Sequence, residues 1–88
     1  MKTFDRDALG RALAATCKSL RERAEIAQED FAYEAGMERA QVSLIERGRG
    51  NPTLVTMFKM LPPFKVDFPA FAAELDANLR KRPAKGAQ

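Results

Sequence analysis

The stretch that decides the fold is "QEDFAYEAGMERAQVSLIER", residues 28–47. Its spacing fits two short helices joined by a three-residue turn, Gly36-Met37-Glu38, whose glycine tolerates the positive φ that a sharp turn requires. Ala32 supplies a small side chain where the two helix axes approach each other. Val42 and Ile45 lie three residues apart, so they share one face of the second helix and can pack against the first. This pattern is typical of a helix-turn-helix.

The flanking segments predict three more helices and no strands. Asp5 or Asp7 can cap a first helix, and the third helix of the chain, from about Glu38 to Arg47, ends at Gly48. Thr53 can cap a fourth helix, which the pair Pro62–Pro63 should end because proline lacks an amide hydrogen. The first helix has the apolar stripe Leu9, Leu13, Thr16, Cys17, Leu20 and Ala24, and the fourth has Leu54, Met57, Phe58 and Leu61.

A fifth helix should begin at Asp67 and Pro69 and extend to about residue 79, with Phe68, Phe71, Ala72, Leu75 and Leu79 on its apolar stripe. The sequence therefore predicts an all-α domain of five helices over residues 1–79. Residues 80–88 ("RKRPAKGAQ") read as a disordered basic tail. The tail has four basic residues and no acidic one, so residues 1–79 have 11 basic and 12 acidic residues and a net charge of −1. Any basic face must come from the arrangement of charges.

Composition excludes several classes of function. The chain has 88 residues, one cysteine (Cys17) and no histidine, so no disulfide can form within it and no metal site is expected. No convergent acid-base or nucleophile set is visible, and we expect neither an enzyme nor a cofactor. Cys17 lies on an apolar stripe and is expected to be a buried hydrophobe. A single cysteine, with no export signal and no membrane span, favours a reducing cytoplasm. No small-molecule ligand is evident from the sequence.

The stretch "IAQEDFAYEAGMERAQVSLIERGRGNPTL" resembles the Cro/cI-type (XRE-like) helix-turn-helix family, over about Cys17 to Val66. The Gln-x-x-x-Ala opening, the glycine turn and the Ile-Glu-Arg-Gly close followed by Asn-Pro carry the resemblance. Within that family the chain looks most like controller proteins of restriction-modification systems, or small phage or mobile-element repressors. The resemblance implies a compact lambda-repressor-like domain in a bacterial cytoplasm or nucleoid. The family often has Gly where this chain has Glu25, Ser or Thr at Ala27, and helical residues at the two prolines.

Roles follow for residues on and beside the recognition helix, about 38–47. Its outward side chains should contact base edges in the major groove, with Arg39 suited to guanine and Gln41 to adenine. A phosphate-binding set should flank them. The resemblance implies that Glu46 turns inward and pairs with Arg21. The expected base-reading residues are Arg39, Ala40, Gln41, Ser43 and Leu44, and the expected phosphate-binding residues are Gln28, Arg47, Arg49 and Asn51.

The expected function is a sequence-specific transcription regulator that binds a (pseudo)palindromic operator in double-stranded DNA as a homodimer, because one domain covers only half of such a site. The fifth helix is the expected interface. RNA polymerase or another protein is a further candidate partner. The alternative function is an antitoxin or antiactivator on the same fold, whose main partner is a protein. The expected interface residues are Phe64, Val66, Phe68, Phe71 and Leu75.

Overall fold

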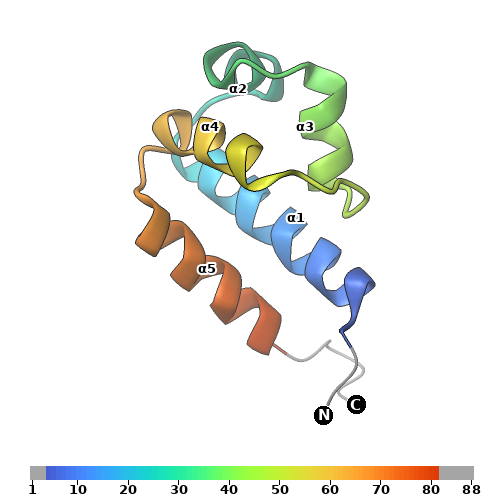
Figure 1. The fold of residues 1–88 in the computed structure, drawn as a ribbon. Coiled ribbons are helices and arrows are strands. Elements are labelled where there is room, and N and C mark those ends of the chain that lie inside the picture. The colour runs from blue at the N-terminus through green and yellow to red at the C-terminus, as the bar shows by residue number, and fades with distance from the viewer. Residues whose placement is uncertain (1–3, 82–88) are drawn as a thin grey trace.

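The computed structural model describes residues 4–81, which form five α-helices and no strand (Figure 1). The all-α prediction is therefore confirmed. The long α1 packs against α5 on one side and against α3 on another, while α2 packs against both α3 and α4. Within the described residues, no helix is long and apolar enough to cross a membrane. The helices are α1 (Arg6–Arg23), α2 (Gln28–Ala35), α3 (Arg39–Glu46), α4 (Leu54–Phe64) and α5 (Phe68–Arg80).

Three helices begin at side-chain caps that are visible in the sequence. Asp5, Thr53 and Asp67 each accept a hydrogen bond from the backbone N–H three residues later, at 3.0–3.1 Å. Such a cap satisfies one of the amides that the first helical turn leaves without a partner. Of the two candidates for α1, Asp5 is the cap and Asp7 lies in the first turn. These caps fix where α1, α4 and α5 begin and therefore how the connecting loops run.

The core is one apolar cluster that gathers side chains from all five helices. Its centre is a row of aromatic rings in which Phe64 lies between Phe31 and Phe71, with ring centroids 4.7 Å and 6.1 Å away. The one buried polar side chain among the described residues is Thr16. Its hydroxyl donates to the Ala12 carbonyl and accepts from the Asn78 amide, each at 2.8 Å. This chain of hydrogen bonds ties α1 to α5.

The structure corrects the prediction for α4 in two respects. The helix continues through Pro62 and Pro63 and ends at Lys65, which adopts a left-handed conformation with φ of 64°. Both prolines lie in the last turn, where their fixed φ suits a helix and only two amide donors are lost. The buried face is also rotated from the predicted stripe: Met60, Leu61, Pro63 and Phe64 are buried, whereas Leu54 and Phe58 are exposed.

Arg80, which the prediction placed in the tail, belongs to a helix instead. Arg80 is the last residue of α5, and its Nε donates to Asp76 Oδ2 at 2.8 Å, one turn earlier. A cation in the last turn also interacts favourably with the helix dipole. This interaction helps to keep Arg80 in the helix, although basic composition predicted disorder from residue 80. The prediction of a disordered tail at residues 82–88 concerns positions outside those that the structure describes.

Candidate nucleic-acid interface

The turn between α2 and α3 holds the two helices at a fixed angle. Gly36 ends α2 with φ of 69° and ψ of 36°, and the amide of Met37 donates to the Ala32 carbonyl at 2.8 Å. This closure satisfies carbonyls at the end of α2 that would otherwise lack partners. Val42 and Ile45, 1% and 2% exposed, anchor α3 in the core. Because one face of α3 is fixed in this way, its opposite face is presented to solvent.

The predicted base-reading residues lie off the buried face of α3. Arg39, Ala40, Gln41 and Leu44 are exposed, and Ser43 is half-buried. Arg39 is the first residue of the helix, so its guanidinium extends from the helix N-terminus. The helix is short and lies at the edge of the molecule in Figure 1. These positions meet the geometric requirement for a helix whose first turns enter a groove.

The loop after α3 carries exposed polar side chains beside the same surface. Gly48 has φ of 81°, and the Arg49 amide donates to the Leu44 carbonyl at 2.9 Å, so the loop folds back on α3. The loop also approaches the backbone of α1 closely: a Cβ at Gly10 would lie 2.6 Å from the Gly48 carbonyl oxygen. The loop is therefore held between two helices. Its three predicted phosphate-binding residues, Arg47, Arg49 and Asn51, are all exposed.

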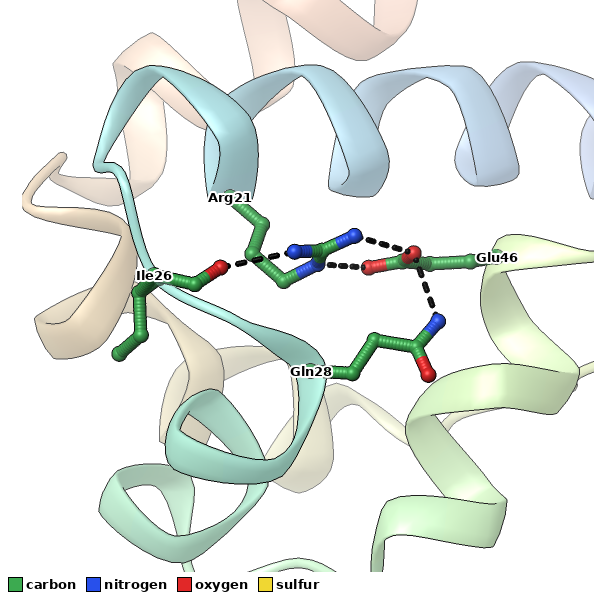
Figure 2. Close-up of polar contacts among 4 residues, drawn as sticks. All are labelled: Arg21, Ile26, Gln28 and Glu46. Atoms are coloured by element: carbon green, nitrogen blue, oxygen red, sulfur yellow. Dashed lines mark hydrogen bonds and ion pairs between the residues drawn. The ribbon is translucent and has the colours of Figure 1, made fainter.

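Glu46 points away from this surface and joins a partly buried polar cluster (Figure 2). Arg21 Nε lies 2.6 Å from Glu46 Oε2, and Arg21 Nη2 lies 3.0 Å from Oε1. Gln28 Nε2 donates to the same Oε1 at 3.0 Å, and Arg21 Nη1 donates to the Ile26 carbonyl at 2.7 Å. The Arg21 and Glu46 side chains are only 13% and 6% exposed. The cluster thus links α1, the start of α2 and the end of α3, and the pair of Arg21 with Glu46 expected from the resemblance is present.

Electrostatics keeps this carboxylate charged. Burial by itself raises the pKa of Glu46, but hydrogen bonds from Arg21 and Gln28 and the charges of Arg21 and Lys18 outweigh burial and leave the pKa below its ordinary value. Cys17 behaves in the opposite way. Burial, with a smaller contribution from the Glu46 charge, raises the pKa of its thiol to about 12. The thiol therefore stays protonated near neutral pH and packs as an apolar group.

Gln28 stands at the N-terminus of α2, where free amides favour an anion. Ala27, the residue at the cap position, makes no side-chain hydrogen bond to the helix. Gln28 itself is half-buried, and its amide nitrogen is engaged by Glu46. Gln28 therefore ties the start of α2 to the end of α3, whereas its contact with a phosphate stays a prediction.

The predicted dimer interface needs correction. Phe64 and Phe71 are 3% and 1% exposed and belong to the core of the single chain. Val66, Phe68 and Leu75 are partly buried and pack against that core. In the single chain, Phe64 of α4 packs between Phe31 of α2 and Phe71 of α5, and Phe68 of α5 stacks on Phe58 of α4. Phe64 and Phe71 are therefore not available to a second chain, whereas a role for Val66, Phe68 and Leu75 in an interface stays a prediction.

Sequence reasoning missed a different apolar surface at the start of α4. Leu54, Val55 and Phe58 are 58%, 71% and 48% exposed, and with Lys59 they line a shallow hollow. We call these three apolar residues the α4 patch. The missed signal is that Met57, Met60, Leu61 and Phe64 already supply a complete buried stripe at helical spacing. The remaining apolar residues of α4 must then face outward.

Residues 18–71 match the family model described as helix-turn-helix, and the chain belongs to this family, of XRE type. It is similar to the restriction-modification controller protein C.Esp1396I. The wild-type crystal structure is 25% identical with a TM-score of 0.77, covering 91% of this chain and 100% of that chain. The C.Esp1396I tetramer in complex with its natural 35-base-pair operator gives the same four values. A single-substitution mutant is 27% identical with a TM-score of 0.78, covering 83% and 97%. No curated protein matches the chain.

Proposed function

We propose that the protein is a sequence-specific regulator of transcription that inserts α3 into the major groove of double-stranded DNA. The observation that carries the proposal is the exposed N-terminal end of α3, with Arg39 as its first residue, on a helix anchored by Val42 and Ile45. The Arg39 guanidinium matches the O6 and N7 acceptors of guanine. Gln41 can pair with adenine, Ser43 can donate to a base or a phosphate, and the methyl groups of Ala40 and Leu44 suit a thymine methyl.

The proposed phosphate contacts come from both sides of α3. Arg47, Arg49 and Asn51 are exposed in the loop that follows it, and Gln28 stands at the start of α2. Such contacts position the protein on the duplex without reading its sequence. The similarity to C.Esp1396I, which is known in complex with its operator, supports binding of operator DNA by this chain as well. The near-neutral net charge of residues 1–79 does not oppose this proposal, because Arg39, Arg47 and Arg49 are all exposed on α3 and the loop after it, where they can form a basic face without a net positive charge.

The homodimer is also part of the proposal, with the α4 patch as its centre. A contiguous group of three exposed apolar side chains on one helix is unusual on a small monomer and is typical of an interface. A domain this small buries a modest share of its surface and gains stability from a partner subunit. Two copies that pair through α4 would present two recognition helices to two half-sites. Such pairing is consistent with the oligomeric state of C.Esp1396I on its operator.

The test is selection of bound duplexes from a random double-stranded library by the full chain. The proposal expects one enriched motif with two-fold symmetry and half-sites about one helical turn, or a multiple of one turn, apart. Retention of all sequences alike, or of none, would contradict it. The antitoxin or antiactivator function keeps one favourable observation, the α4 patch, which can instead bind a different protein. A monomer that selects no motif but forms a stoichiometric complex with another protein from the same cell would support that alternative.

A further inference from the structure

Two exposed cations on α1 are not among the residues proposed to contact DNA. Arg11 and Lys18 are both exposed and, among residues 4–81, neither takes part in an ion pair. They are seven residues apart, which is two helical turns or about 10 Å along the axis. They therefore form a row on one face of α1.

Contacts with α3 and the loop show which face this is. The side of α1 that meets them is marked by Gly10, against the Gly48 carbonyl, and by Arg21, against Glu46. Because successive residues turn by about 100°, Arg11 and Lys18 lie to one side of this contact. The buried residues Leu13, Thr16 and Leu20 lie on the other side, toward the core.

Two independent proximities agree with this placement. A Cβ at Gly48 would lie 3.9 Å from the Arg11 Cα, so Arg11 stands directly beside the loop that carries Arg47 and Arg49. Lys18 is close enough to Glu46 for its charge to contribute to lowering the pKa of that carboxylate. Each cation is thus next to one end of the seam between α1 and α3. Figure 1 shows the same relationship, with the loop after α3 beside α1.

The outer side of this seam carries the proposed DNA surface as well. On α3, Glu46 points into the seam, and helical geometry places Ser43 and Arg47 on the outer side of it, away from Val42 and Ile45. Acidic residues on α1 lie near the two cations: Asp7 and Glu22 are each one turn away, at i−4 from Arg11 and i+4 from Lys18. Neither acid holds its neighbour in an ion pair. Both cations are therefore free to meet an external anion.

We infer that Arg11 and Lys18 bind phosphates of the DNA backbone beyond the half-site contacted by α3, and so widen the footprint of each domain. The inference rests on the proposed function. Such contacts are electrostatic and carry no sequence information. Each neutralised phosphate adds about 0.9 to the slope of log K against log salt concentration. Between 50 and 200 mM salt, a chain with both contacts should therefore lose about 12-fold more affinity than a chain without them.

The test measures that slope on a duplex chosen by library selection with the wild-type chain. The double variant Arg11→Gln, Lys18→Gln is compared with the control Arg23→Gln, Lys65→Gln, which removes the same charge from exposed positions elsewhere. Arg23 forms an ion pair with Glu74 of α5, with Nη2 and Oε2 2.7 Å apart, and Lys65 is the residue at the C-terminal end of α4. Thermal melting establishes that all variants fold. Lys59 is avoided as a control because it borders the α4 patch.

The inference expects the slope to fall by about 2 in the α1 variant, with the selected motif unchanged and with a wild-type slope in the control. An unchanged slope in the α1 variant would overturn the inference while leaving the proposed function intact. An equal fall in both variants would also overturn it, because net charge alone would then explain the effect. A wild-type chain that binds no duplex would overturn the proposed function and this inference together.

Discussion

Arg21 and Glu46, twenty-five residues apart, form a two-contact ion pair in which Arg21 Nε lies 2.6 Å and Nη2 3.0 Å from the two carboxylate oxygens. The pair ties the end of α3 to α1, and Gln28 adds a hydrogen bond from the start of α2. Glu46, the acidic residue among the arginines of residues 39–49, therefore holds the helices together. Its inward direction leaves the outer surface of α3 free of a carboxylate that would repel phosphate.

Glu46→Ala should destabilise the fold strongly. It would leave the Arg21 charge buried with only the Ile26 carbonyl as a partner, and removal of one side of a buried pair costs about 3–5 kcal/mol. The measurement is chemical denaturation. Replacing both partners with methionine should restore much of the loss, because desolvation offsets most of the attraction in such pairs. A Glu46→Ala variant with wild-type stability would show that the pair is not structurally important.

The stability of the fold should depend on pH through the titration of Glu46. The folded-state pKa of Glu46 lies below its ordinary value, so the unfolded chain takes up a proton first as the pH falls. The stabilisation is fully present above the ordinary glutamate pKa, about 4.3, and is lost as the pH falls through the lower folded-state pKa. Melting temperatures between about pH 6 and 2.5 should fall more steeply for the wild type than for Glu46→Gln. Parallel curves would contradict the assignment.

Glu25→Gly should stabilise the protein. Glu25 has φ of 59° in the turn between α1 and α2, a left-handed conformation that costs a residue with a Cβ about 1–2 kcal/mol. Glycine removes that strain, but it makes the unfolded chain more flexible, and this offsets about 0.4–1 kcal/mol of the gain in stability. A net gain of about 0.5–1 kcal/mol is expected by denaturation. Glu25→Ala is the control: it removes the charge, keeps the Cβ and should show no such gain.

Val55→Glu should separate the proposed dimer. Val55 is 71% exposed and is the most exposed residue of the α4 patch. A carboxylate there would lose its hydration on association, and pairing with Lys59 one turn later would not offset that cost. Light scattering at tens of micromolar should give a dimer for the wild type and a monomer for the variant, with equal helix content by circular dichroism. Tyr33→Glu changes an 87% exposed aromatic residue on α2, outside the patch, and should remain dimeric. A wild-type monomer would contradict the proposed dimer, and a dimeric Val55→Glu variant would show that the interface lies outside the α4 patch.

The local signals in the sequence were sufficient to predict most of the fold. Caps such as Asp5 and Asp67, the glycine turn and the periodic stripes are local, so they specify where helices begin and which face is buried. The prediction that Pro62 and Pro63 end α4 was wrong because a proline pair near the end of a helix is compatible with its last turn. The exposed Leu54 and Phe58 were misassigned because hydrophobic spacing alone does not distinguish two adjacent stripes on one helix.

The site divides in a similar way. The pair of Arg21 with Glu46 came from the resemblance, since nothing in the local sequence connects residues twenty-five apart. The hydrogen bond between Asn78 and Thr16 has no sequence signal of its own, because it depends on how α5 crosses α1. The predicted interface at the fifth helix rests on the number of apolar residues in and just before that helix. Such a count does not show how much of that surface one chain covers by itself.

The central claim, that α3 reads base edges through Arg39, is tested most directly by repeating the library selection with Arg39→Ala. Arg39 is exposed at the helix N-terminus and makes no ion pair within residues 4–81, so the variant should fold as the wild type does. The account predicts that one guanine preference disappears from each half-site, at a cost of about 1–3 kcal/mol in affinity for the original motif, while the half-site spacing is kept. Selection of the same motif with the same guanine by the variant would contradict the claim.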